Sequence, residues 1–351
     1  MKFNLLKSLI LTTLIVAASV SCKKDDSTTV TPSLNGSLKF SAPEFVLPGT
    51  ALKMTPAGAE HPDGGDLGYY WKVSPVMETS DTIKRPGDGT QKDSSFTFTF
   101  PDSLGTYTIY CSAFAKSGYS SLSGTNYVTV VKGGLEGSIQ GRQILPNDPH
   151  ETIDGIDYYY SEIGGLKWMR SNLEAGAGEP FRRSDAMSDI FGKFFSYEEA
   201  VNACPEGWRL PGEADWTALC KALGADSQTE AYSNVPGMAA RLMVDASFNS
   251  YTMWTYCREV GDPTNESKLA MIPVGYANLG EKASSPEADP YLDLLYPEAS
   301  FKGLYEYAVF WTADEASTEE AYYRYLFQQS SELKIGKADK KYFGASVRCV
   351  K

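Results

Sequence analysis

The residues from Ser95 to Phe100 read Ser-Phe-Thr-Phe-Thr-Phe, so an aromatic ring occupies every second position. Successive side chains of a β-strand point to opposite faces, and this alternation therefore predicts a strand that is buried on one face. Tyr69 to Val73, Thr106 to Phe114 and Tyr127 to Val131 are further β-rich runs that follow glycine-containing turns. Short strands between turns, without helical periodicity, predict an all-β sandwich over residues 35–132.

Two segments of this stretch carry a likeness to a known family. The strand Tyr69-Tyr70-Trp71 is followed along the chain by Phe100-Pro101-Asp102 and Gly105-Thr106-Tyr107-Thr108-Ile109. Together they resemble an immunoglobulin-like domain of the polycystic-kidney-disease (PKD) type, which implies that Trp71 fills the space between two sheets and that the domain is a spacer. The family's Gly-Asp-Gly turn is missing after the Trp strand, and Gly87-Asp88-Gly89 lies farther on. Cys111 has no plausible partner in this domain, so we expect a buried free thiol.

The rest of the chain shows helical and β patterns together. Ser196 and Glu199 form a capping box at the start of a helix that must stop at Pro205. In a second predicted helix over 213–223 the apolar side chains share one face, and a weaker helical pattern covers 237–244. This mixture predicts an α+β domain. Strands are predicted at Leu269 to Tyr276, Tyr307 to Thr312, Tyr322 to Phe327 and Ala345 to Val350.

Several segments of this second stretch follow one another in the order of a family pattern. The most specific is Ala203-Cys204-Pro205-Glu206-Gly207-Trp208-Arg209-Leu210-Pro211. The others are Asp154-Gly155 with Tyr158, Gly165-Leu166-Lys167-Trp168-Met169 with Asn172-Leu173, Asp215-Trp216, Ile272-Pro273-Val274-Gly275-Tyr276, Phe310-Trp311-Thr312 and Ser346-Val347-Arg348-Cys349. Together they resemble the Fibrobacter succinogenes major paralogous domain, which is similar to a branch of the C-type-lectin-like fold.

The resemblance implies an α+β C-type-lectin-like domain over residues 133–351, in which a cysteine at the end of the first helix pairs with one in the last strand. Cys204 and Cys349 occupy those places, so a disulfide between them is implied. Cys220 and Cys257 are the remaining candidates for a second bridge, although Cys220 also fits a buried free thiol on its helix. The sequences with which C-type lectins bind sugar through calcium are not found, so the fold does not by itself imply lectin activity.

The first residues of the chain predict export. Ser8 to Val20 is mostly apolar but too short to cross a bilayer, and the run that ends in Ser21-Cys22 resembles a lipobox. It implies a lipoprotein signal peptide over 1–21 and a membrane anchor on Cys22; a secretory signal with an incidental cysteine is the alternative. The polar residues 22–34 predict a flexible tether.

The acidic cluster after Cys22 resembles the surface-export signals of Bacteroidota lipoproteins, with a plain solvated linker as the alternative. The expected location is therefore the outer membrane. There the protein would face the cell surface or, alternatively, the periplasm.

Charge and motif content argue against several classes of function. The formal net charge of −12 excludes nucleic acid as an expected partner, because phosphate binding needs a basic face. His61 and His150 lie in different domains, which argues against a Ser-His or Cys-His pair in either. No zinc or phosphate-binding motif occurs, so no metal and no cofactor is predicted. The loop Asp262-Pro263-Thr264-Asn265-Glu266 offers oxygen ligands for calcium, but a plain turn is the preferred interpretation.

The predicted function is non-catalytic binding or display, with an unknown protein or glycan as the ligand. Tyr158-Tyr159-Tyr160 and Tyr322-Tyr323 would serve as stacking platforms for such a ligand, although ordinary strand packing also explains them. The first alternative is a structural subunit of a surface appendage, and the second is an accessory glycan hydrolase. A hydrolase would draw its carboxylates from Glu174, Glu179, Asp185 and Asp189, which a solvated acidic face explains equally.

Lipidation can be tested by replacing Cys22 with serine. The Cys22→Ser variant should stay uncleaved by lipoprotein signal peptidase and should lose acyl label, because the thiol that carries the lipid is gone. Metabolic labelling with a fatty acid, followed by fractionation, measures both. An acylated, mature Cys22→Ser protein would show that the anchor lies elsewhere.

Overall fold

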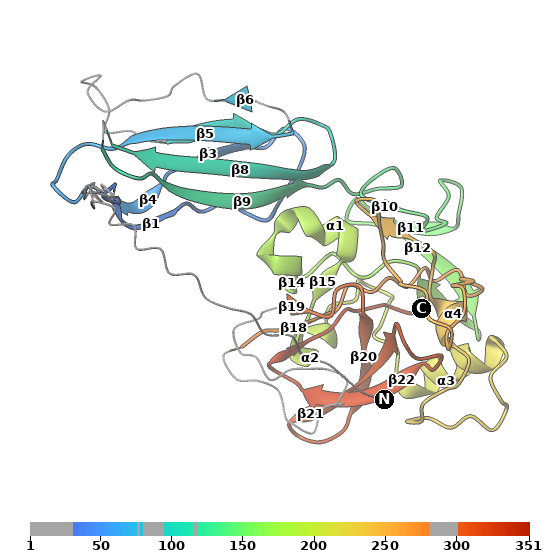
Figure 1. Ribbon diagram of the computed structural model, residues 1–351. Coiled ribbons are helices and arrows are strands. Elements are labelled where there is room, and N and C mark those ends of the chain that lie inside the picture. The colour runs from blue at the N-terminus through green and yellow to red at the C-terminus, as the bar shows by residue number, and fades with distance from the viewer. Residues whose placement is uncertain (1–30, 76–77, 80–94, 116–117, 281–300) are drawn as a thin grey trace, which may run out of the picture.

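The structure is a computed structural model and describes residues 31–75, 78–79, 95–115, 118–280 and 301–351 (Figure 1). The signal peptide, Cys22, most of the tether and the Gly87 to Gly89 turn lie outside the described residues. Strands dominate the described chain, as the β-rich patterns predict. None of its helices has the length and apolar character needed to span a membrane.

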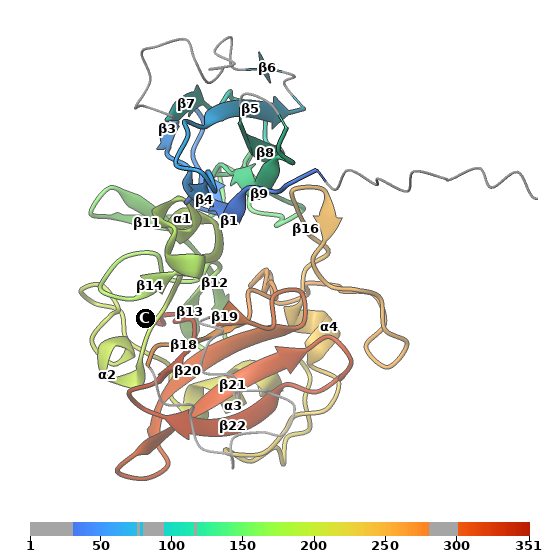
Figure 2. The same ribbon diagram turned by 60° about the vertical axis from the view of Figure 1, so that its left-hand side comes forward.

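The first part of the chain consists of two layers of strands that face each other (Figures 1 and 2). One layer is a five-stranded sheet in the order β2-β9-β8-β5-β6, in which only the β2–β9 pairing is parallel. The antiparallel pairs β1-β4 and β3-β7 form the other. The strands are β1 (Asn35–Lys39), β2 (Phe45–Val46), β3 (Ala51–Met54), β4 (Ala57–Glu60), β5 (Gly68–Ser74), β6 (Glu78–Thr79), β7 (Phe96–Thr99), β8 (Gly105–Phe114) and β9 (Leu122–Val130).

Aromatic side chains fill the space between these layers. Trp71 of β5 is buried, and its ring contacts Phe40 and Phe96, whose centroids lie 5.0 and 5.6 Å away. This is the interior position that the sequence predicts for the tryptophan. Leu34, which we assigned to the tether, is also part of this core. The tether is therefore shorter than predicted, because an apolar residue next to the first strand gains more from burial than from hydration.

The second part combines short strands with four short α-helices in its described residues. Its largest sheet is β20-β21-β22, and Figure 2 shows α3 behind it. The helices are η1 (Phe181–Arg183), η2 (Asp185–Met187), α1 (Ser188–Phe191), α2 (Tyr197–Ala200), α3 (Glu213–Ala222) and α4 (Ala239–Leu242). The strands are β10 (Ile139–Gln140), β11 (His150–Ile153), β12 (Ile156–Ile163), β13 (Leu166–Met169), β14 (Glu179–Pro180), β15 (Lys193–Phe194), β16 (Ser247–Phe248), β17 (Tyr251–Thr252), β18 (Tyr276–Asn278), β19 (Phe301–Lys302), β20 (Tyr307–Glu315), β21 (Glu320–Phe327), β22 (Lys334–Asp339) and β23 (Phe343–Gly344).

All three predicted helices are present, but two of them are much shorter than predicted. The capping box between Ser196 and Glu199 is present at the start of α2. This helix nevertheless ends at Ala200, and the amides of Asn202 and Ala203 bond three residues back, to Glu199 and Ala200, instead of four. α3 has the predicted extent within one residue, and Gly224, with φ +91°, ends it. Of the helix predicted over 237–244, only the single turn of α4 is helical.

Two predicted strands are wrong in detail. Of Leu269 to Tyr276, only Tyr276 lies in a strand, since Ala270 (φ +50°) and Gly275 (φ +83°) turn the backbone out of the extended region. The segment Ala345 to Val350 is buried and extended but forms no continuous ladder. It instead bonds to a different segment every one or two residues.

This terminal segment, residues 345–351, threads through the centre of the second part. Ala345 exchanges backbone hydrogen bonds with Phe195 (2.9 and 3.1 Å), and Val350 does so with Arg209 (2.8 and 2.9 Å). Between them, Val347 and Cys349 accept amide bonds from the chain at residues 169–173 (2.9 and 3.1 Å). The segment therefore joins parts of the chain that are far apart in sequence.

The disulfide that the family resemblance implies is present. Cys204 and Cys349 are bonded; their Cα atoms lie 5.8 Å apart, and the two residues are 145 positions apart in sequence. Cys349 is fully buried within the hydrophobic core, against which Cys204 packs. The bridge fixes the terminal segment to the end of the turn that follows α2.

The two parts of the chain contact each other at the β2 end of the first. Phe45 packs against Phe181 and Phe248, at ring centroid distances of 5.9 and 6.4 Å. The Ser184 hydroxyl donates to the Phe45 carbonyl at 3.0 Å, and Arg182 forms an ion pair with Glu44. The domain boundary at residues 132–134 stays a prediction, but the parts on either side of it share a hydrophobic cluster.

Removing the disulfide should destabilise the protein strongly. In the chain-entropy model, opening a loop of 145 residues costs up to about 5 kcal/mol of unfolding free energy. We expect Cys204→Ala/Cys349→Ala to lose several kcal/mol in urea-induced unfolding. Cys257→Ser is the matched control, because that thiol is free and only partly buried, and it should stay within about 0.5 kcal/mol of the parent. Equal stability of the two variants would contradict a structural role for the bridge.

Candidate functional site

A polar groove of about 490 Å³ lies on the second part of the chain. Two loops form it, and the lining residues are Thr255, Tyr256, Cys257, Glu259, Gln328 and Gln329. Its size falls in the range of small-molecule sites, which span about 300 to 1,000 Å³.

The first wall of the groove is a tight turn held by a buried tryptophan. Trp254 is buried, and its indole N–H donates to the Met271 carbonyl at 2.9 Å. The turn closes where the amides of Val260 and Gly261 donate to the Cys257 carbonyl, at 3.1 and 2.9 Å. The anchor lies immediately before Thr255, so the following residues are held at the surface.

The second wall follows the end of β21. The Gln328 amide donates to the Glu306 carbonyl at 2.9 Å, and the Ser330 amide donates to the Phe327 carbonyl at 2.9 Å. The Phe327 ring stacks on Tyr307 with centroids 4.8 Å apart. These contacts fix the backbone at Gln328 and Gln329, both of which line the groove.

The groove offers one aromatic face and several hydrogen-bonding groups. Tyr256 is 69% exposed, so its ring is accessible to a ligand. The two glutamine amides supply both donors and acceptors. The Cys257 thiol donates to the Glu259 carboxylate at 3.0 Å, and this hydrogen bond lowers the pKa of Glu259. The groove therefore carries a fixed negative charge at neutral pH.

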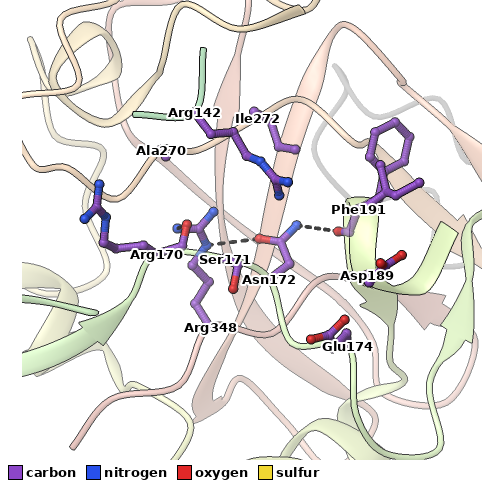
Figure 3. A pocket seen from close by; sticks show the side chains of 12 residues that line it. Arg142, Arg170, Ser171, Asn172, Glu174, Asp189, Phe191, Ala270, Ile272 and Arg348 are labelled. Carbon is purple, nitrogen blue, oxygen red and sulfur yellow. Dashed lines mark hydrogen bonds between the residues drawn. The ribbon is translucent and has the colours of Figure 1, made fainter. Parts of the chain in front are cut away.

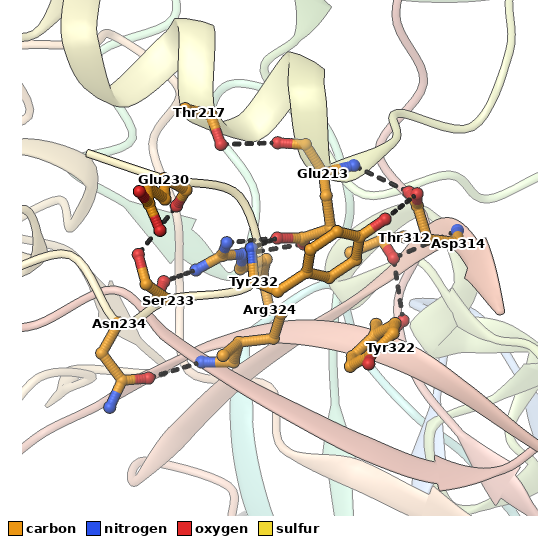
Figure 4. A network of polar contacts seen from close by, with 11 residues as sticks. Glu213, Thr217, Glu230, Tyr232, Ser233, Asn234, Thr312, Asp314, Tyr322 and Arg324 are labelled. Carbon is orange, nitrogen blue, oxygen red and sulfur yellow. Dashed lines mark hydrogen bonds and ion pairs between the residues drawn. The ribbon is translucent and has the colours of Figure 1, made fainter. Parts of the chain in front are cut away.

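A buried ion pair positions the strand that leads into the groove (Figure 4). Glu213, the first residue of α3, is fully buried, and its carboxylate accepts from Arg324 Nε at 2.9 Å. The Tyr232 amide donates to the same carboxylate at 3.0 Å, and Arg324 Nη1 donates to the Ser233 carbonyl at 2.7 Å. Asp314 accepts from the Glu213 amide at 2.7 Å. The network ties α3, β20, β21 and the 230–234 loop together.

The predicted tyrosine clusters are mostly structural. Tyr158 and Tyr323 are buried in the main core of the second part. Tyr322 remains at the surface, where its ring lies 4.9 Å from that of Tyr232. Tyr232 is 50% exposed and donates its hydroxyl to Asp314 at 2.7 Å, which raises the pKa of Tyr232 to about 12. The pair is a stacking surface that residue runs alone do not reveal, because Tyr232 comes from a distant loop.

The structure brings together two of the four carboxylates that a hydrolase would draw on. Glu174 and Asp189 line one small pocket together with arginines, as Figure 3 shows. Glu179 lies in β14 and Asp185 in η2, and both are exposed and outside this pocket. The pocket has a volume of only about 30 Å³, which is too small for a sugar ring.

The loop from Asp262 to Glu266 is a structural turn in this fold. Asn265 is buried, and its side-chain oxygen accepts from the Ala270 amide at 2.9 Å. Glu266 forms an ion pair with Arg241 at 3.3 Å. Two of the loop's oxygen-bearing side chains are thus engaged within the protein. Among the described residues, no group of three or more His, Cys, Asp or Glu side chains is arranged to hold a metal ion.

The candidate second disulfide between Cys220 and Cys257 is absent, and the alternative of a free thiol at Cys220 holds. Cys220 and Cys257 are both free thiols. Cys220 is fully buried on the apolar face of α3, where burial raises its pKa to about 12, while Cys257 lies in the groove. Cys111 is a buried free thiol as predicted, and burial raises its pKa to about 12 as well. His61 and His150 are ring neighbours of Tyr119 and Tyr159 in separate parts of the chain.

Comparison with known families identifies the family to which the second part of the chain is similar. The model of the Fibrobacter succinogenes major domain matches residues 162–351, which is more than half of the chain. The chain belongs to this family. No curated protein matches it. The matched residues include the disulfide, the buried ion pair, the groove and the terminal segment.

Sequence reasoning did not find the groove. Its two walls are separated by about 70 residues, and neither contains a recognised motif. The only local signal is the alternation of Trp254 and Tyr256 within a polar stretch. Which of these rings turns outward is decided by the hydrogen bond of Trp254 to Met271, which sequence alone does not show.

The buried ion pair can be tested by removing one partner. Arg324→Met leaves the Glu213 carboxylate buried without its cation, so we expect a loss of about 3–5 kcal/mol in urea-induced unfolding. Arg209→Met is the matched control, since Arg209 pairs with Asp215 of the same helix but is 55% exposed. That variant should lose no more than about 1 kcal/mol. Losses of the same size would show that burial of the pair is unimportant.

Proposed function

We propose that this protein is an exported lipoprotein that binds a neutral saccharide, without catalysis, in the groove beside Tyr256. The anchor is the lipid on Cys22, and the location is the outer membrane, facing the cell surface. The first part serves as a PKD-type, immunoglobulin-like spacer, and the family domain has a C-type-lectin-like fold. The lipobox-like run supports the anchor, and the buried Trp71 supports the spacer.

The carrying observation is the exposed Tyr256 ring beside two side-chain amides. A pyranose stacks its C–H face on an aromatic ring and presents hydroxyls at its edge, which pair with amide donors and acceptors. The ionised Glu259 accepts a hydroxyl proton but repels a carboxylate or sulfate on the ligand. The net charge of −12 acts in the same direction, so a neutral sugar is favoured over an acidic one.

The two rival functions find less support. A subunit that assembles by strand addition needs a free, apolar sheet edge. The sheet β20-β21-β22 has two outer strands. Its β20 edge is partly occupied by bridges from Ala308 to Gly275 and from Phe310 to Ser346, and β22 carries Lys334 and Lys337. A glycosidase needs two carboxylates flanking a sugar-sized cleft, and the described lining of the groove contains one carboxylate, Glu259.

The test is a glycan- and protein-array screen of residues 27–351, followed by titration of the hits. We expect Tyr256→Ala to weaken binding of a neutral glycan about tenfold or more, because about 1.4 kcal/mol is lost with the stacking face. Tyr251→Ala is the control, since Tyr251 is 70% exposed but does not line the groove. If the parent binds a protein and Tyr256→Ala does not, the groove is the binding site but the proposed saccharide ligand is wrong. Binding that neither variant changes would overturn the groove itself.

A further inference from the structure

The pocket of about 30 Å³ shown in Figure 3 is small, yet three arginine side chains line it. Arg142, Arg170 and Arg348 all line it, together with Asn172, Glu174 and Asp189. It has room for about two water molecules or one single-atom ion. It lies away from the groove at Tyr256 and shares no residue with it.

Arg348 is a buried cation whose hydrogen bonds all reach neutral acceptors. Its side chain is 1% exposed. Nε donates to Asn172 Oδ1 at 3.0 Å, and Nη1 donates to the carbonyls of Met169, Arg170 and Leu269 (3.3 and 3.0 Å for the first two). Arg348 forms no ion pair with any residue that the structure describes. An unpaired buried charge is costly, and the groups that contact this one are neutral: its hydrogen-bond acceptors and the Phe310 ring, whose centroid lies 5.4 Å from the guanidinium carbon.

Arg142 adds a second cation to the same pocket. Its guanidinium extends over Asn172 toward the pocket interior, as Figure 3 shows, and Nη2 donates to the Gly134 carbonyl at 3.2 Å. Burial, together with the charges of Arg142 and Arg170, lowers the pKa of Arg348 to about 9. Arg170 differs from both, since it forms an ion pair with Asp148 at 2.5 Å. The two unpaired guanidinium groups therefore face one small cavity.

The two carboxylates of the pocket are incompletely neutralised. Burial raises the pKa of Glu174 and of Asp189, and the Asp189 charge raises that of Glu174 further. Arg142 and Lys193 oppose the shift at Glu174, and Arg142 opposes it at Asp189. Neither carboxylate forms an ion pair with a described residue, although cations lie nearby. The charges are thus separated across the pocket instead of being paired.

We propose that this pocket binds a single-atom anion such as chloride between Arg142 and Arg348. Such an ion supplies the negative charge that Arg348 lacks among its hydrogen-bond partners. Polyatomic anions such as sulfate do not fit a cavity of about 30 Å³. Water fits equally well by volume, but it offers no charge to either guanidinium.

The carboxylates give the site a pH dependence of definite sign. Above their raised pKa values, Glu174 and Asp189 are ionised and repel an anion. As the pH falls through those values they become neutral, whereas a falling pH removes no positive charge from the arginines around them. Asp148, whose pKa is lowered, also stays ionised over this range. Anion affinity should therefore rise as the pH is lowered through the raised pKa values of Glu174 and Asp189.

The experiment is thermal unfolding of the full chain in detergent, with sodium gluconate replaced stepwise by sodium chloride at constant ionic strength. The stabilisation reports the apparent chloride dissociation constant. Arg142→Gln should raise this constant about tenfold or more, and Glu174→Gln should lower it several-fold at pH 7.5. Arg182→Gln is the control, because Arg182 is an exposed arginine outside the pocket, and its chloride response should match the parent.

Three results would overturn the proposal. They are a flat chloride response of the parent, an equal response of the parent and Arg142→Gln, and weaker binding by Glu174→Gln. Line broadening of chloride NMR by the parent, lost in Arg142→Gln, would support it independently of stability. If Arg142→Gln fails to fold, its melting point in gluconate will be lower than that of the parent. In that case the chloride affinity of Glu174→Gln at pH 7.5 tests the proposal.

Discussion

The burial of the terminal segment, residues 345–351, is the constraint on which the second part of this protein depends. A buried segment must satisfy its backbone amides and carbonyls, and here the partners come from four separate regions of the chain. The Cys204–Cys349 bridge and the Arg348 guanidinium add side-chain links at two consecutive positions. Arg348 in turn holds the carbonyls of Met169, Arg170 and Leu269, so one side chain orders two loops.

A second buried interaction lies in the same domain. The Glu213–Arg324 pair is enclosed on all sides, and its remaining hydrogen-bonding capacity is used by Tyr232 and Ser233. A pair that is desolvated contributes little net stability, but it penalises every arrangement in which it is broken. We infer that it selects one register of α3 against β21. The strand then delivers Gln328 and Gln329 to the groove in one orientation.

Local patterns in the sequence predicted much of the fold. The features that they failed to predict all depend on contacts that form only in the folded chain. The Ser-Phe-Thr-Phe-Thr-Phe alternation and the apolar face of α3 are local, so the strand and the helix could be recognised from them. Residues 269–276 look the same as a strand because they are apolar, yet irregular backbone buries them. Apolar composition predicts burial there but not backbone geometry. The groove was missed because its walls meet only after folding.

The sequence by itself determined the β-rich character of the first part, the start of α2, the extent of α3 and, through its match to a family pattern, the pairing of Cys204 with Cys349. These depend on residues within a few positions of one another or on a recognised order of motifs. Only the tertiary structure decided that Cys220 and Cys257 stay apart and that Tyr256 turns outward. It also brought Arg142 to Arg348 from 206 positions away. The physical reason is that burial and charge separation are properties of packed neighbours, and those neighbours are distant in the chain.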